Sequence, residues 1–104
     1  MERWVILLSI PGLRRQDLPM MPRSAETLPH EVPLTPSFPC VTWPVQANML
    51  TGRLPREHGV VANGFYWRES RQVEMWTAGN QRSEAPQIWD RLHERHPDCL
   101  SAVW

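Results

Sequence analysis

The chain contains no lysine and only two cysteines in its 104 residues. Its eleven basic residues, all arginines, balance eleven acidic residues, so the formal net charge is zero. A neutral chain has no electrostatic footprint for a nucleic-acid polymer or an anionic membrane surface, and we expect neither as a partner. We attribute the missing lysines to codon composition in the source genome rather than to chemistry.

The two cysteines, Cys40 and Cys99, are too few and too far apart to form a disulfide framework or a zinc knuckle. We expect them to be free thiols in a reducing compartment. The sequence also lacks a long hydrophobic run. The apolar run at residues 4–10 is too short to span a bilayer, and no small-residue cleavage site follows it. These absences together predict a cytoplasmic location.

Proline, by contrast, is abundant, and eight of the eleven prolines lie between Pro11 and Pro44. Proline fixes its own backbone and removes an amide donor, so this half must hold a long irregular stretch. We predict a loop over residues 15–39, and a loop of this length inside a domain usually has a function or covers a site. Hydrophobic residues make up 41% of the chain, which is enough for a globular core.

Two apolar segments are typical of buried strands in a parallel sheet. Residues 4–10 are rich in valine, isoleucine and leucine, and Pro11-Gly12 ends the run. Residues 100–104 begin a second run of this kind. A helix is expected between them at 84–96, with Ser83 as its N-cap. We therefore predict two parallel neighbouring strands connected by a right-handed helical crossover.

The middle of the chain predicts a helix followed by a hairpin. The helix is expected over residues 42–50, with a proline in its first turn where a missing amide proton costs nothing. Residues 65–70 and 71–76 alternate aromatic or β-branched side chains with polar ones, which favours an antiparallel hairpin that turns near 69–72. The predicted fold class is therefore α/β, with a mostly parallel sheet and a small β-hairpin.

The sequence stops inside an apolar segment, and an open apolar strand edge invites aggregation. We therefore expect residues 1–104 to be the incomplete N-terminal portion of one larger domain. Pairing with another chain is the alternative. A self-standing interaction domain, with six tryptophans supplying an aromatic surface, is a further interpretation.

The chemistry is concentrated around Thr42, where a loop enters a predicted helix. Amide groups and the helix dipole at such a point favour an anion, phosphate above all. A hydroxyl placed there can attack phosphorus when a metal ion lowers its pKa. The alternative is that Thr42 acts only as the N-cap of the helix.

Four short motifs follow one another within residues 42–64. In order they are Thr42-Trp43-Pro44, Thr51-Gly52, Pro55-Arg56-Glu57-His58-Gly59 and Asn63-Gly64. Their order and spacing resemble the nucleophile region of the alkaline phosphatase superfamily, in the branch of type I phosphodiesterases/nucleotide pyrophosphatases and phosphonoacetate hydrolases. The resemblance implies the N-terminal part of a three-layer α/β/α fold.

The resemblance also implies roles for individual residues. Thr42 would be the nucleophile and a metal ligand, and the amide of Asn63 would donate to a phosphoryl oxygen. The alternative for Asn63 is a turn residue before Gly64. His58 would belong to a structural loop rather than to the metal site. The implied function is metal-dependent hydrolysis of phosphodiesters or nucleotides, which are small-molecule phosphoesters, through a covalent phosphothreonine.

The implied cofactors are two divalent metal ions, with zinc as the expected metal. The family's first strand normally ends in Asp-Gly and this Asp holds a metal, but here Pro11 stands in its place. Asp17 is a distant substitute, and the remaining ligands would lie beyond Trp104. We therefore expect the 104-residue chain alone to bind zinc weakly and to be inactive. A metal-deficient pseudoenzyme or phosphate-ligand binding module with the same fold is the alternative function.

Overall fold

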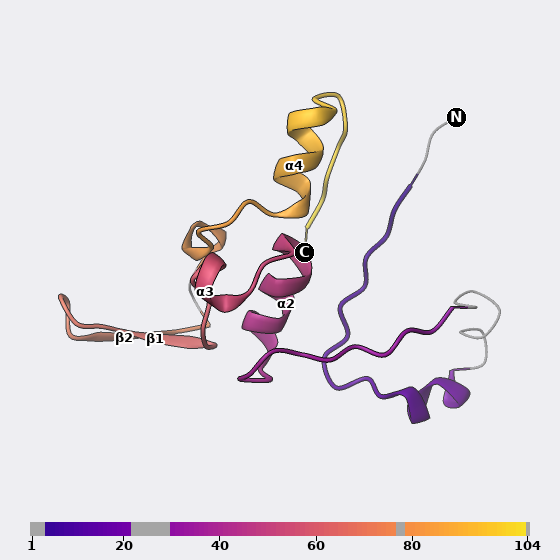
Figure 1. Cartoon of the computed structure of the whole chain (residues 1–104), viewed down its shortest axis with the longest axis horizontal. Helices are drawn as coiled ribbons and strands as arrows, with labels where there is room; N and C mark the ends of the chain where they lie inside the picture. Colours follow the sequence, from indigo (N-terminus) through magenta and orange to yellow (C-terminus); the bar gives the residue numbers. More distant parts are fainter. Residues whose placement is uncertain (1–3, 22–29, 77–78, 104) are drawn as a thin grey trace. The chain divides into compact units, whose positions relative to one another are not determined.

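The computed structural model describes residues 4–21, 30–76 and 79–103. It divides the chain into two compact units, Met1–Thr35 and Pro36–Trp104 (Figure 1). Across the described ranges, no helix is both long and apolar enough to cross a bilayer.

The first unit is mostly extended chain with one short helix. Residues 4–10 have no regular secondary structure, and a tight turn follows, in which the N–H of Leu13 donates to the carbonyl of Ile10 at 3.2 Å. Gly12 has a φ of 84°, which is why glycine suits the third position of this turn. The 3₁₀ helix η1, Arg15–Met20, comes next within the predicted loop.

The predicted pair of parallel strands is not formed. Neither residues 4–10 nor residues 100–103 are in a strand, and Trp104 lies outside the described residues. Val5 is 94% exposed and Leu100 is 96% exposed. A parallel strand needs hydrogen-bonded neighbours and cover on both faces. The described part of the chain supplies neither, so the apolar composition alone does not produce the strand.

The second unit begins with helix α2, Thr42–Thr51, which agrees with the predicted helix to within one residue. Val41 precedes it with extended backbone, and Pro44 fits its first turn because an N–H there has no helical partner to lose. Gly52 ends the helix in the left-handed region, with a φ of 66°.

Helix α3, Pro55–His58, is a single turn that packs against α2. It forms within the segment predicted as a loop. The small core lies here: the side chains of Val60 and His58 are fully buried, and Pro44 and Ala47 of α2 are also buried.

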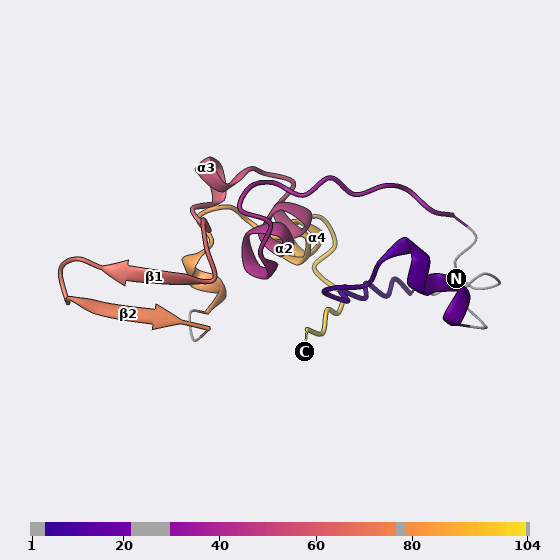
Figure 2. The same ribbon diagram turned by 90° about the horizontal axis from the view of Figure 1, so that it is seen from below.

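The predicted hairpin is confirmed, with shorter strands. Strand β1, Gly64–Trp67, pairs antiparallel with β2, Gln72–Met75, so that Gly64 lies opposite Met75 (Figure 2). A Cβ atom at Gly64 would lie 2.7 Å from Cγ of Met75. A side chain at position 64 would therefore force Met75 to shift.

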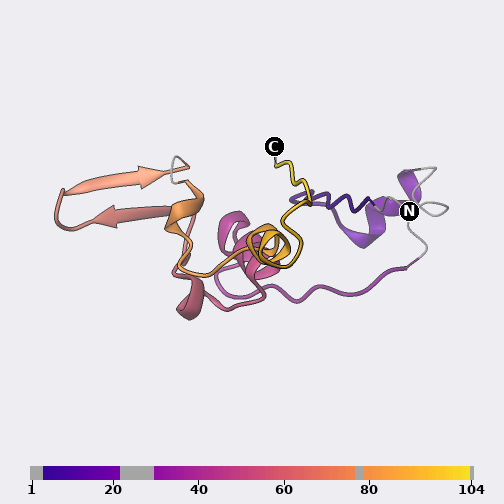
Figure 3. The same ribbon diagram turned by 90° about the horizontal axis from the view of Figure 1, so that it is seen from above.

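Helix α4, Ile88–Arg95, starts four residues later than predicted and follows the short 3₁₀ helix η2, Asn80–Arg82 (Figure 3). Its N-cap is Gln87 and not the predicted Ser83, whose hydroxyl donates to the carbonyl of Ala85 at 3.0 Å. The residue before Pro86 is disfavoured in helical conformation, which delays the start.

Candidate functional site

Thr42 is the first residue of α2, and it is half-buried. The N-cap is Val41, whose backbone is extended with φ −121° and ψ 161°. The interpretation of Thr42 as the N-cap is therefore wrong. The Thr42 hydroxyl makes no hydrogen bond with the residues that the structure describes. This hydroxyl therefore does not cap the helix.

Asn63 contacts the first turn of α2, the turn that begins with Thr42. Asn63 lies directly before β1, and its Oδ1 accepts a hydrogen bond of 2.8 Å from the backbone N–H of Trp43. The two residues are 20 positions apart in sequence. Because the carbonyl end of the amide faces the helix, its Nδ2 group is the end left for a ligand. Asn63 thus does more than form a turn before Gly64.

The helix N-terminus offers fewer free donors than the sequence suggests. The N–H of Trp43 is bound by Asn63, and Pro44 has no N–H. The N–H of Val45 donates to the carbonyl of Val41 at 3.3 Å. Of the amides at the start of α2, that of Thr42 is left to face an anion, together with the helix dipole.

His58 lies at the centre of a hydrogen-bonded network that connects α2, α3 and the segment before α2. Its Nδ1 accepts from the N–H of Val60 at 3.0 Å. The ring proton therefore sits on Nε2, which donates to Oδ1 of Asn48 at 2.7 Å. The amide of Asn48 donates in turn to the hydroxyl of Ser37 at 2.6 Å. His58 is a structural residue, as the resemblance implies.

Burial favours the neutral form of His58. Its side chain is fully buried, and this burial lowers the pKa of the imidazole below its ordinary value of 6.5. A second ring proton on Nδ1 would also face the N–H of Val60, so that two donors would meet. The hydrogen-bond geometry and the lowered pKa thus both favour a neutral ring with its proton on Nε2.

Sequence reasoning missed Asn48. Asparagine is a weak helix former. Its presence inside a predicted helix is the one signal in the sequence that its side chain binds another segment. The neighbouring Glu57 pairs with Arg53 at 3.1 Å, and its second oxygen accepts from the N–H of Leu54.

An aromatic row continues from the site onto the hairpin. The rings of Trp43 and Phe65 meet edge to face with centroids 5.5 Å apart, and Phe65 stacks on Trp67 at 5.7 Å. The guanidinium of Arg82 lies over the Trp67 ring, 4.4 Å from its centroid. The row ties the first turn of α2 to β1.

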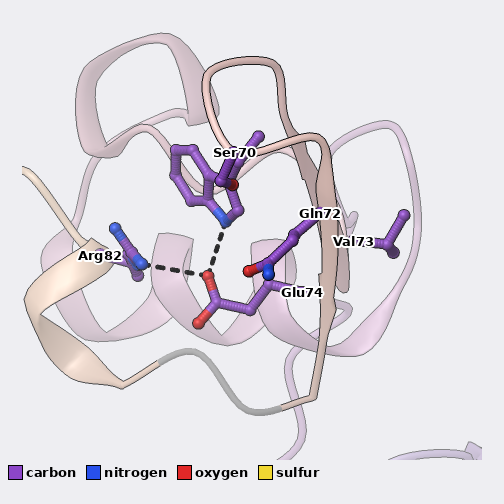
Figure 4. Close-up of a pocket in the computed structure, with 6 residues that line it drawn as sticks. Ser70, Gln72, Val73, Glu74 and Arg82 are labelled. Atoms are coloured by element: carbon purple, nitrogen blue, oxygen red, sulfur yellow. Dashed lines mark hydrogen bonds and ion pairs between the residues drawn. The ribbon is translucent and has the colours of Figure 1, made fainter.

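The far end of this row borders an open hollow of about 380 Å³ on the hairpin. Glu74 accepts hydrogen bonds there from the indole Nε1 of Trp67 at 2.8 Å and from Arg82 at 3.1 Å. Figure 4 shows Glu74 and Arg82 facing each other across it. Trp67, Glu74 and Arg82 thus bind one another at the hollow, whose lining also includes Ser70 and Gln72.

The described residues do not form a metal site. They contain no group of three or more His, Cys, Asp or Glu side chains placed to hold an ion. Asp17, the distant substitute for a ligand at Pro11, is bound by Arg14: its two carboxylate oxygens accept from the guanidinium at 2.8 and 3.0 Å. This hydrogen bonding lowers the pKa of Asp17. The donor set present therefore does not fit a pair of metal ions.

Comparison with known proteins connects this geometry to a family. The model of the type I phosphodiesterase/nucleotide pyrophosphatase family matches residues 5–104. The chain is also 37% identical, over 67 residues, to an uncharacterized pyrophosphatase/phosphodiesterase of Schizosaccharomyces pombe. That match covers 60% of this chain but only 14% of the yeast protein. No solved structure matches the chain.

Proposed function

Because the chain belongs to the type I phosphodiesterase/nucleotide pyrophosphatase family, we propose that the complete protein hydrolyses small phosphodiesters or nucleotides through a covalent intermediate on Thr42. The observation that carries the proposal is the 2.8 Å hydrogen bond between Trp43 and Asn63. It supports the proposal because it holds the Asn63 amide at the first turn of α2, where the Thr42 hydroxyl has no hydrogen-bond partner among the described residues.

The reaction is a pair of displacements at phosphorus. In the first, Oγ of Thr42 forms a bond to phosphorus while the bond from phosphorus to the leaving alcohol breaks, and the hydroxyl proton leaves with the alcohol. In the second, water attacks the same phosphorus, releases the phosphate monoester and restores the hydroxyl. Nδ2 of Asn63 donates to the phosphoryl oxygen on which charge develops.

Activation of the hydroxyl requires help that the described residues do not supply. None of their His, Asp or Glu side chains hydrogen-bonds to Thr42. The proposal includes two divalent metal ions, with zinc as the expected metal. Since the donor set described above does not fit them, their ligands would come mostly from residues other than those that the structure describes.

Trapping the intermediate tests the proposal. The complete protein is mixed with bis(4-nitrophenyl) phosphate, quenched in acid within one turnover, digested and analysed by mass spectrometry. The peptide that contains Thr42 should carry a 4-nitrophenyl phosphoryl group. Thr42→Val, which keeps the size of the side chain without its hydroxyl, is the control. Turnover that persists in Thr42→Val would contradict the covalent route.

A second function is favoured by one observation, namely that Pro11 stands where the family has a metal-binding Asp while Asp17 is bound to Arg14. On this alternative the protein is a metal-deficient pseudoenzyme that retains a phosphate pocket. Calorimetry with a phosphate monoester would then show saturable binding without turnover. Binding and turnover that are both abolished by chelators would exclude this alternative.

A further inference from the structure

The two residues of the proposed site are connected by a closed circuit of contacts. From Thr42 the circuit runs along α2 to Asn48, six residues or about 9 Å along the helix axis. It crosses to His58 by the 2.7 Å hydrogen bond and continues to the N–H of Val60. Three residues later the chain reaches Asn63, which returns to α2 at Trp43.

Asn48 also forms a hydrogen bond with the segment that precedes Thr42. Its Nδ2 donates to the hydroxyl of Ser37, which lies in the irregular stretch just before α2. One amide therefore fixes the helix, the loop that follows it and the segment that precedes it. The helix begins at Thr42, the segment before it leads into Thr42, and the loop after it ends at Asn63.

The amide of Asn48 can have only one orientation in this network. Because Nδ1 of His58 accepts from Val60, Nε2 must donate, and so Oδ1 of Asn48 must face the histidine. Nδ2 is then directed at Ser37. Each bond fixes the direction of the next, which makes the circuit sensitive to the loss of any one group.

From this arrangement we propose that Asn48 is a positioning residue, which sets the orientation of the Thr42 hydroxyl relative to Asn63 through Ser37 and His58. The inference rests on the proposed function and deepens it. A displacement of about 1 Å at a reacting group can cost on the order of 100-fold in rate, so an indirect residue of this kind can have a measurable effect on catalysis.

Three variants of the complete protein test the positioning role, with bis(4-nitrophenyl) phosphate as substrate. Asn48→Leu keeps the volume of the side chain but removes both hydrogen bonds. Its kcat should fall about 10- to 100-fold while KM changes less than about twofold. Asn48→Asp keeps an acceptor for His58 and a second oxygen to which the Ser37 hydroxyl can donate, so it should retain most of kcat.

The matched control is Thr51→Val on the same helix. The Thr51 hydroxyl is buried, donates to the carbonyl of Ala47 at 2.6 Å and accepts from the N–H of Arg53 at 3.1 Å, but it has no bond to the described residues before α2. Thr51→Val should lower the melting temperature about as much as Asn48→Leu does and leave kcat unchanged. An equal loss of kcat in Thr51→Val and Asn48→Leu would overturn the inference, because helix stability alone would then explain it.

A spectroscopic measurement tests the network without any turnover. With ¹⁵N-labelled histidine, His58 should show a protonated Nε2 and an unprotonated Nδ1. Asn48→Leu should shift the Nε2 resonance, whereas Thr51→Val should not. An unchanged resonance, an unchanged kcat in Asn48→Leu, or equal losses in Asn48→Asp and Asn48→Leu would each refute the positioning role. If Thr42→Val is as active as the wild type, the proposed function itself fails, and this result is distinct from the others.

Discussion

Replacing Thr42 by alanine separates catalysis from stability, because the structure gives this residue no capping role. Loss of an N-cap would cost about 1 kcal/mol. As the first helical residue, Thr42 instead gains helix propensity on becoming alanine, up to about 0.7 kcal/mol. It loses one half-buried methyl group, which costs about 0.4 kcal/mol, or half of the value for a fully buried one. The free energy of unfolding should therefore change by less than about 0.5 kcal/mol.

The hydrolysis rate should respond very differently. Without the Thr42 hydroxyl the covalent route is closed, and kcat of the complete protein should fall on the order of 10³-fold or more. Thr42→Ser keeps a hydroxyl and should retain part of the activity. The assay is release of nitrophenolate from bis(4-nitrophenyl) phosphate, with urea denaturation of the same preparations. Hydrolysis within tenfold of wild type in Thr42→Ala would refute the nucleophile, and destabilisation beyond about 1.5 kcal/mol would refute the stability argument.

Two further predictions follow from His58 and Pro11. Because burial lowers the pKa of His58, the unfolded chain takes up a proton below about pH 6.5 that the native ring does not, so stability should fall as the pH falls from there. Melting temperatures between pH 7.5 and 5.5 should show a shallower loss in His58→Gln than in the wild type, and equal slopes would contradict the assignment. Pro11→Asp places a carboxylate where the resemblance implies a metal-binding Asp, so the complete protein should bind zinc more tightly in calorimetry than a Pro11→Ala control does. Equal affinities in these two variants would show that position 11 does not reach the metal.

Local signals in the sequence predicted those elements that need only their near neighbours. Helix α2 follows from Pro44 in its first turn and Gly52 at its end, and the hairpin from alternating side chains that pair across a short turn. The segments at 4–10 and 100–103 are different, because a parallel strand depends on neighbours that no local pattern supplies. The predicted start of α4 at residue 84 was wrong, because Pro86 disfavours a helical backbone at the residue before it and the helix begins at Ile88.

For the site, the sequence indicated the residue types but not their connections. The motif spacing predicts that Thr42 and Asn63 belong together, and the structure places Asn63 on the N–H of the residue next to Thr42. The role of these two residues in catalysis stays a prediction. The contact itself could not be predicted from local pattern, because it joins positions 20 residues apart through a side chain. The same is true of Asn48 and His58, whose hydrogen bond depends on how α2 and α3 pack.

The hairpin has a tight base and an open tip, and this contrast determines where its length can vary during evolution. At the base, Gly64 adjoins Asn63 and has no room for a side chain against Met75. An insertion there would shift the pairing register and displace Asn63 from α2. At the tip, residues 68–71 are exposed, and Arg71 already adopts a φ of 54°. Added residues there would lengthen the loop without moving Asn63, so relatives can diverge at this turn while the site stays in place.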